Sequence, residues 1–459
     1  MKRILILFFF IALKQINAQV CFNAGLDFDS YWGYSARPCA ADFNSDGKLD
    51  IAIVSIGQVG SVILGTGTGF FQTPTTFSTI GYSPNYLISA DFNGDSKPDL
   101  ATTTNSLVEV FLGNGTGSFS IPTNTILLNN TPWFNNYSFP EAVDLNLDGK
   151  MDLLVLDYQL NTVSVLIGTG TGNFSAPVNY TVGLFPSDIL CADFNGDGNP
   201  DVATSNNSSN DISILLGTGI GGFSSITSFS STPGIRRIEA ADFNSDLKVD
   251  IIGTDILNNV FLLFGNGAGG FNPVTNFSVA GVSNIFDIKQ ADFNNDGKID
   301  IAFADFSADK IGVILGSGSG TFSTFFSYGF ATDPQGITSG DFNGDSKIDL
   351  VTANDNTTSV TYFQNCTSTT IDDLSNSNFV VELYPQPAKD VVNISLSYFY
   401  EPTIEIIITD VTGKIVRSST LVVRSGKTQI ETSELSDGVY ILQIISKNQI
   451  ANKRLIVAK

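Results

Sequence analysis

A nine-residue acidic segment recurs seven times in this chain of 459 residues and constrains its fold more than any other feature. The first copy, "DFNSDGKLD", spans residues 42–50, and the copies begin at positions 42, 91, 144, 193, 242, 292 and 341, in steps of 49 to 53 residues. Turn-forming composition explains one such segment but not a regular period. The period indicates a chain built from repeated structural units of about 50 residues.

The conserved spacing within the copies predicts a metal site in each loop. Every copy has Asp at position 1, Asn at position 3 and Asp at positions 5 and 9, and the residue at position 7 can add its backbone carbonyl. Such an all-oxygen ligand set favours calcium over magnesium. We therefore expect up to seven Ca²⁺ sites. Their predicted ligands are Asp42, Asn44, Asp46, Lys48 and Asp50; Asp91, Asn93, Asp95, Lys97 and Asp99; Asp144, Asn146, Asp148, Lys150 and Asp152; Asp193, Asn195, Asp197, Asn199 and Asp201; Asp242, Asn244, Asp246, Lys248 and Asp250; Asp292, Asn294, Asp296, Lys298 and Asp300; and Asp341, Asn343, Asp345, Lys347 and Asp349.

Position 6 of the segment varies between copies. Glycine occupies it in four of them and suits a left-handed backbone, whereas the others have Ser96, Leu247 and Ser346. A branched side chain is costly at positive φ, so the loop at residues 242–250 departs furthest from the pattern.

The segments around each loop read as strands. Short apolar runs such as "DIAIVS" and "DLLVLD" follow the loops. An EF-hand is excluded, because it needs flanking helices and a Glu at position 12. Each repeat also has a strand that ends in "ADF", a third strand, a glycine turn and a fourth strand after a Phe. Four strands in every repeat predict an all-β fold, a seven-bladed β-propeller.

Two other recurring features have structural explanations. Glycine-rich stretches such as "GTGTGF" (65–70) resemble phosphate-binding motifs, but no helix pattern follows them, so we interpret them as hairpin turns. The Phe at position 2 of the loops, as in Phe43, Phe92 and Phe194, is expected to pack between blades.

The loops, with the strand and glycine turn that follow them, resemble the FG-GAP/VCBS repeat family, which includes the seven-bladed heads of integrin α chains. The resemblance covers residues 19–366. It implies calcium in the loops on one face of the propeller. It also implies a role in adhesion or ligand binding, with an extracellular glycan or protein as the partner.

The two ends of the chain indicate export. Residues 1–18, "MKRILILFFFIALKQINA", have the cations, the short apolar run and the small final residue of a signal peptide. Residues 367–378 are polar and without periodicity, as expected of a linker. Residues 379–459 contain alternating strands of a small β-sandwich.

Motifs in the C-terminal region, "YPQPAKD", "DVTGKIV" and "LSDGVYIL", resemble the type A sorting domain of the type IX secretion system. The resemblance implies that the chain engages the type IX machinery and crosses the outer membrane of a Gram-negative bacterium. Release or attachment at the cell surface would follow.

The composition and charge of the chain exclude several classes of function. The net charge of −22 and the lack of a basic patch exclude nucleic acid as a partner. No segment is long and apolar enough to predict a transmembrane helix. The chain has no histidine, which removes histidine-based catalytic triads and the usual zinc sites. We expect a binding protein rather than an enzyme; the alternatives are a polysaccharide lyase and a passive structural protein of the surface.

Aromatic residues gather in the connections that lead from the fourth strand of one blade to the first strand of the next, on the face opposite the acidic loops. Flat rings suit sugars and protein partners. The alternative is that these side chains pack within their own loops. The predicted ligand-binding residues are Tyr31, Trp32, Tyr34, Tyr82, Tyr86, Trp133, Phe134 and Tyr137.

The repeat region begins and ends within a blade. Residues 21–28 align with the fourth-strand segments, and the seventh repeat stops after its third strand, at residues 359–366. The N-terminal segment should therefore complete the last blade and close the ring. Cys21 and Cys366 would then lie side by side and form a disulfide in an exported protein. Cys39 and Cys191, on the first strands of blades one and four, should remain buried thiols.

Overall fold

A computed structural model describes residues 20–30, 37–55, 57–81, 84, 86–104, 107–122, 124–127, 138–279, 281–328, 331–355, 357–367, 380–385, 387–397, 401–410, 415–424, 426–436, 438–446 and 449–458. The described chain divides into two compact units, Val20–Cys366 and the region from Thr367 onward. The predicted signal peptide, residues 1–18, lies outside the described residues, and so does the predicted linker 367–378 apart from Thr367.

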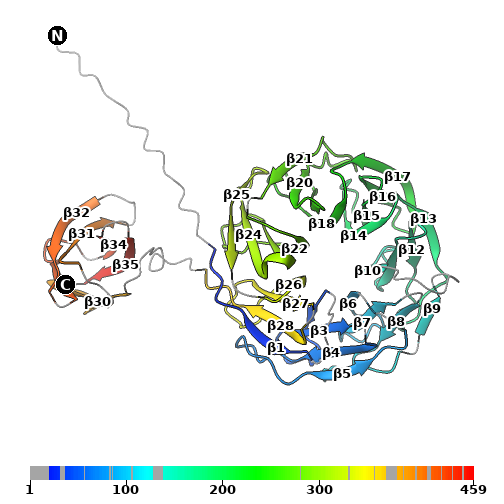
Figure 1. Cartoon of the computed structure of the whole chain (residues 1–459), viewed down its shortest axis with the longest axis horizontal. Helices are drawn as coiled ribbons and strands as arrows, with labels where there is room; N and C mark the ends of the chain where they lie inside the picture. Colours follow the sequence, from blue (N-terminus) through cyan, green and yellow to red (C-terminus); the bar gives the residue numbers. More distant parts are fainter. Residues whose placement is uncertain are drawn as a thin grey trace, which may run out of the picture. The chain divides into compact units, whose positions relative to one another are not determined.

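The first unit consists of seven antiparallel sheets of four strands each, arranged as a ring (Figure 1). Each sheet is a blade, numbered 1 to 7 by the order of its first strand in the sequence. The first strands are β2 (Cys39–Ala41), β6 (Tyr86–Ala90), β10 (Ser138–Val143), β14 (Pro186–Ala192), β18 (Ile235–Ala241), β22 (Ile285–Ala291) and β26 (Pro334–Gly340). The second strands are β3 (Asp50–Ser55), β7 (Asp99–Thr103), β11 (Asp152–Asp157), β15 (Asp201–Asn206), β19 (Asp250–Asp255), β23 (Asp300–Asp305) and β27 (Asp349–Asn354).

The third and fourth strands complete each blade. The third strands are β4 (Val59–Ile63), β8 (Leu107–Phe111), β12 (Thr162–Leu166), β16 (Asp211–Gly217), β20 (Asn259–Leu263), β24 (Lys310–Gly316) and β28 (Ser359–Phe363). The fourth strands are β5 (Thr75–Ser78), β9 (Asn124–Leu127), β13 (Val178–Thr181), β17 (Phe223–Ser230), β21 (Thr275–Ser278), β25 (Phe322–Tyr328) and, in blade 7, β1 (Leu26–Asp29). A short 3-10 helix, η1 (Phe306–Ala308), follows β23.

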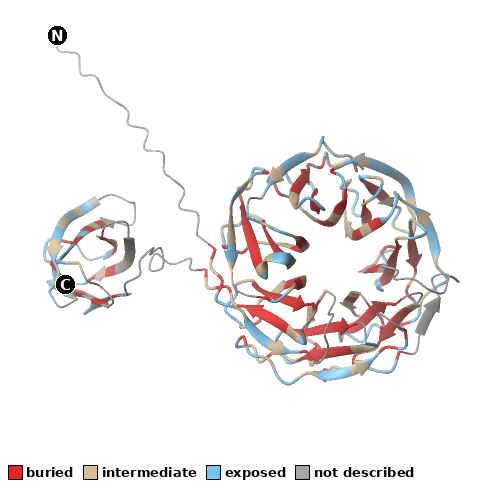
Figure 2. Ribbon diagram, in the orientation of Figure 1, coloured by how far each residue is buried: buried red, intermediate tan, exposed pale blue. Residues whose placement is uncertain are grey.

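Burial changes from the inner to the outer strands of a blade (Figure 2). The second strands are buried along their whole length, as in β3 and β11. Fourth strands such as β5 and β13 are mostly exposed. A second strand is covered by neighbouring blades on both faces, which explains why β3 and β11 are nearly continuous apolar runs instead of alternating ones.

Loops and glycine turns connect neighbouring blades. The residues at position 2, including Phe43, are buried, as predicted. The amide of Gly117, in the glycine turn of blade 2, donates to the carbonyl of Phe43 in blade 1 at 2.9 Å. A Cβ on Gly117 would lie 2.8 Å from the side chain of Leu64, also in blade 1. These turns are therefore hairpin turns, as predicted, and they need glycine because the preceding blade lies so close.

The N-terminal segment closes the ring, which confirms the prediction. Strand β1 pairs with β28, and Phe22 bridges to Asn365 as Phe71 does to Gly65 in blade 1. Cys21 and Cys366 form a disulfide with their Cα atoms 5.0 Å apart. Cys39 and Cys191 are free thiols, as predicted, but they are only partly buried, because the first strands line the centre of the ring.

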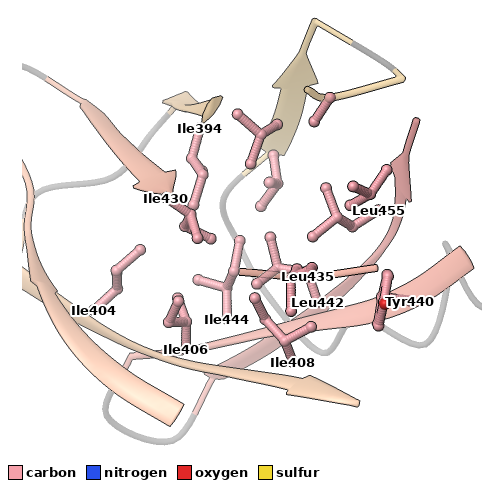
Figure 3. Packing of buried hydrophobic residues seen from close by; sticks show 14 of the residues in the cluster. Ile394, Ile404, Ile406, Ile408, Ile430, Leu435, Tyr440, Leu442, Ile444 and Leu455 are labelled. Carbon is pink, nitrogen blue, oxygen red and sulfur yellow. The ribbon is translucent and has the colours of Figure 1, made fainter. Parts of the chain in front are cut away.

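The C-terminal unit is a small β-sandwich, as predicted. One sheet has the order β29 (Val380–Tyr384), β30 (Val391–Ser397) and β33 (Lys427–Glu431). The other has the order β32 (Ile415–Val422), β31 (Thr403–Asp410), β34 (Gly438–Ser446) and β35 (Gln449–Val457). Aliphatic side chains such as Ile394, Ile406 and Leu442 fill the space between the sheets (Figure 3). Among the described residues, no helix is long and apolar enough to span a bilayer.

Candidate functional site: acidic loops on one face and an aromatic pocket on the other

The aspartate at position 9 of each acidic loop is fully buried and joins the loop to the glycine turn of its own blade. In blade 1, Asp50 accepts hydrogen bonds from the amides of Phe43 at 2.9 Å and Gly65 at 2.7 Å. Burial raises the pKa of Asp50 to about 6, although the two amide donors lower it. The same pair of hydrogen bonds recurs in the other blades, with Asn365 in place of the glycine in blade 7. Position 9 therefore has a structural role that the sequence did not reveal.

The side chains at positions 1 and 3 fold over the loop backbone. Asp42 accepts from the amides of Asp46 at 3.0 Å and Gly47 at 2.8 Å, and Asn44 accepts from the amide of Asp46 at 2.9 Å. Oxygens of both side chains thus accept from the same amide, that of Asp46. These hydrogen bonds within the loop stabilise its turn.

Position 6 is left-handed in all seven loops, with φ between 64° and 84°. Leu247 adopts φ 66° with its side chain 94% exposed, so the fifth loop keeps its shape despite the branched residue. Ser96 and Ser346 do the same at φ 64°. The departures at this position therefore leave the loop backbone unchanged.

The oxygen atoms that these loops offer are of the type that binds calcium. Positions 1, 3 and 5 supply carboxylate and amide oxygens, and position 7 can supply a carbonyl. No three acidic or cysteine side chains converge into one cluster within the described part of the chain. The position-9 carboxylate is hydrogen-bonded to two buried amides, so the acids of a loop that reach solvent are the half-buried one at position 1 and the one at position 5.

A lysine at position 7 lies beside the position-5 aspartate in six loops, with Nζ to Oδ2 distances of 3.1 to 3.6 Å. In blade 3, the hydrogen bond from Lys150 lowers the pKa of Asp148. Blade 4 has Asn199 at this position, so its loop has one more net negative charge than the others.

A pocket of about 350 Å³ opens on the opposite face of the propeller. Its lining residues come from the beginnings of first strands and from the turns after second strands, and both places are opposite the acidic loops that join first to second strands. The pocket is lined by Tyr86, Phe139, Tyr158, Phe185, Pro186, Ser187, Asn207, Ser208, Arg236, Arg237 and Phe286. We call it the aromatic pocket.

Two rings form one wall of the aromatic pocket. Tyr158 and Phe185 have centroids 5.3 Å apart, and Phe185 is 46% exposed. Phe185 has φ 51°, which is uncommon for a large residue, and Asn161 accepts a hydrogen bond from its amide at 2.7 Å. The chain thus holds an apolar ring open to solvent, an arrangement typical of a binding site.

A polar layer crosses the centre of the ring beside this pocket. Each blade contributes the residue five positions before its loop, namely Arg37, Tyr86, Phe139, Asp188, Arg237, Asp287 and Gly336. Arg37 of blade 1 pairs with Asp188 of blade 4 and Asp287 of blade 6, and Arg237 of blade 5 donates to the hydroxyl of Tyr86 in blade 2 at 2.9 Å. Only side chains at the ring axis can connect blades so far apart in the ring.

A second, more polar cavity of about 300 Å³ includes Arg37, Asp188, Glu141 and Lys289 in its lining. Lys289 pairs with Glu239 at 2.6 Å. Burial raises the pKa of Glu141 to about 7; Glu239 and Asp188 add to the rise, while Lys289 and Arg37 oppose it.

The raised pKa of Glu141 predicts that the free energy of unfolding depends on pH. Because the folded chain keeps the Glu141 proton to about pH 7 and a free glutamic acid loses it near pH 4.5, this group stabilises the fold at low pH. That contribution is lost as the pH rises from about 4.5 to 7. From pH 5 to pH 8, the free energy of unfolding of Glu141→Gln should therefore rise by about 1–2 kcal/mol relative to that of the wild type. This is less than the full shift implies, because Glu141 is only half-buried.

Urea unfolding of both proteins at the two pH values measures this gain. Glu405→Gln, which makes the same change at an exposed position of the C-terminal unit, is the control. An equal gain in both variants, or none in either, would contradict the assignment to Glu141.

The ring and its repeated acidic loops define the class as a seven-bladed repeat propeller. The model of the FG-GAP-like repeat matches six overlapping stretches, residues 42–102, 91–155, 144–204, 193–253, 242–303 and 292–352. The chain therefore belongs to the FG-GAP-like repeat family. The secretion system C-terminal sorting domain matches residues 382–458, and the chain is exported through the type IX system to the cell surface or beyond.

Solved structures share the propeller fold. One is BBS1N in complex with ARL6DN, with 11% identity and a TM-score of 0.56, covering 76% of this chain and 98% of that one. Another is an Agrocybe aegerita lectin that recognises non-reducing terminal N-acetylglucosamine, with 19% identity and a TM-score of 0.51, covering 70% of this chain and 86% of that one. At such identities the likeness shows the fold alone. No curated protein sequence matches the chain.

Of the aromatic residues predicted to bind a ligand, Tyr86 lies in the aromatic pocket. The others, Tyr31, Trp32, Tyr34, Tyr82, Trp133, Phe134 and Tyr137, lie outside the described residues. The sequence reasoning missed Tyr158, Phe185, Arg236 and Phe286. Aligning the repeats on their loops would have drawn attention to "IRRIEAADFN", the one copy in which two adjacent arginines stand five and six positions before the loop.

Proposed function

We propose that the propeller is a non-catalytic binding module of an exported protein, that it holds calcium in its acidic loops, and that it takes a glycan in the aromatic pocket. The observation that carries the glycan proposal is the pocket itself. Its volume of about 350 Å³ lies at the lower end of the range for small-molecule sites, roughly 300–1,000 Å³. A site of this size suits a terminal sugar or a short glycan segment.

The lining of the aromatic pocket favours a sugar over an apolar partner. Phe185 and Tyr158 present ring faces on which the C–H face of a sugar can stack. The amide oxygen of Asn207 and the hydroxyl of Ser208 lie at the same site and can hydrogen-bond to sugar hydroxyls, while the Ser187 hydroxyl and the Asn207 amide nitrogen already donate to the carbonyl of Ile235 at 2.8 and 2.9 Å.

Replacing both wall residues tests the proposal. The double variant Tyr158→Ala, Phe185→Ala of the full chain should bind its glycan about 10- to 100-fold more weakly, roughly the range for losing central aromatic contacts. Binding is measured first on a glycan array and then by titration calorimetry with the best array glycan.

Phe70→Ala provides the control, because Phe70 is also an exposed aromatic residue, at 60%, but lies in a glycine turn. We expect this variant to bind as the wild type does. Wild-type protein that binds no glycan, or a double variant with unchanged affinity, would place the function elsewhere.

A further inference from the structure

A β-bulge near the beginning of the first strand recurs in blades 4 to 7. The register shifts between Pro186 and Asp188, and at the equivalent pairs Ile235 and Arg237, Ile285 and Asp287, and Pro334 and Gly336. The bulged residues are Ser187, Arg236, Phe286 and Gln335. A bulge leaves one residue out of the pairing and re-aims its side chain. Three of these four side chains line the aromatic pocket.

Arg236 is held in this position by neutral groups. Its Nη1 donates to Asn284 Oδ1 at 2.5 Å and to the carbonyl of Ile285 at 3.1 Å. Its guanidinium carbon lies 5.6 Å from the centre of the Phe286 ring. The arginine is therefore fixed over an aromatic face at the pocket wall.

Arg236 forms no ion pair with any described carboxylate, in contrast to the two arginines of the central layer, Arg37 and Arg237. The negative charge of Asp255 raises the pKa of Arg236, but the oxygens of Asp255 accept hydrogen bonds from Leu257 and Asn259 rather than from Arg236. Burial and the charge of Arg237 lower the pKa of Arg236, so a bound anion would relieve an unfavourable environment.

The acidic loops do not cancel this charge. The acidic loops lie at the other end of first strands of up to seven residues, roughly 20 Å away. The Debye length at physiological salt is about 8 Å, so charges that far away through solvent are largely screened. Two arginines, Arg236 and Arg237, line the pocket. Arg237 pairs with Asp287, whereas Arg236 forms no ion pair with a described carboxylate.

We propose that the aromatic pocket is selective for an acidic glycan, whose carboxylate or sulfate pairs with Arg236 while its ring stacks on the aromatic wall. This inference rests on the proposed glycan-binding function and specifies its ligand class. Guanidinium groups pair with carboxylates and sulfates through two parallel hydrogen bonds, which gives direction as well as attraction. A neutral sugar would leave Arg236 without that partner.

The first test compares acidic glycans with their neutral counterparts. The full chain is applied to an array of uronate and sulfated oligosaccharides, beside the same oligosaccharides after carboxyl esterification or desulfation, and beside acidic peptides. We expect binding to the acidic glycans and at least 10-fold weaker binding to the neutral forms. Equal binding to both forms would overturn the acidic selectivity and leave the glycan function standing. Binding to acidic peptides alone, or to no glycan, would overturn both.

The second test changes the arginine. Arg236→Gln should lose at least 10-fold in affinity for the best acidic glycan and should bind the neutral form as the wild type does. Arg236→Lys should recover part of the loss and keep the salt dependence that the glutamine variant lacks.

Lys310→Gln is the matched control, because Lys310 is also a cation over a phenylalanine ring, 5.6 Å from that of Phe325, but it does not line the pocket. It should leave both affinities unchanged. Equal affinity of Arg236→Gln and the wild type for the acidic glycan would overturn the proposal.

Discussion

Removal of calcium should lower the free energy of unfolding of the propeller by up to about 10 kcal/mol. With calcium at roughly 1 mM and a dissociation constant of roughly 0.1 mM, one site adds about 1.4 kcal/mol by mass action, and the seven loops together approach that total. A loss of this size is comparable to the whole stability of an average domain. The physical reason is local, because each loop carries carboxylates at positions 1 and 5 with at most one lysine beside them.

The measurement is urea unfolding of the full chain with 1 mM CaCl₂, with MgCl₂ and with excess EDTA, combined with elemental analysis of the dialysed protein. Asp197→Asn, in the loop without a lysine, should lose about one site's share of the calcium effect. Identical unfolding in calcium and in EDTA, with no calcium in the protein, would contradict the metal proposal.

Loss of the disulfide should be the second large effect. Cys21 and Cys366 are 345 residues apart, and the chain-entropy model gives an upper figure of about 6 kcal/mol for a loop of that length. Cys21→Ala with Cys366→Ala leaves the N-terminal segment attached to blade 7 by strand pairing and side-chain packing, without a covalent bond. The ring should then open more often at this blade.

Unfolding free energies and amide hydrogen exchange of β1 and β28 measure the effect. Cys39→Ala with Cys191→Ala removes two free thiols and is the matched control, expected to cost much less. Equal stability of the two double variants would mean that strand pairing alone closes the ring.

The repeat made the propeller predictable from sequence. A nearly constant period, a fixed set of loop residues and one blade divided between the two ends of the repeat region predicted the number of blades, the closing strand and the partner of Cys21. Leu247 is instructive, because a branched residue at positive φ suggested a distorted loop. Its side chain points into solvent and meets no neighbour, so the cost stays local and the loop retains its shape.

The centre of the ring could not be predicted in the same way. Arg37 and Asp188 are 151 residues apart, and their contact depends on which blades face each other across the axis. No local pattern contains that information. The bulge at Arg236 was equally hidden, since one extra residue in a strand changes the direction of a side chain without altering the apolar pattern around it.

Closure of the ring also determines how the propeller would bear a mechanical load. Any pull on the chain after Thr367 reaches the ring at Cys366, which is bonded both to β28 and, through sulfur, to Cys21. From Cys21 the force passes to Val20 and Phe22, which pack in a cluster with Phe293 of blade 6. A tether attached at this end would therefore pull on two blades at once, and strand β28 could not be stripped from its sheet without also displacing the segment around Cys21.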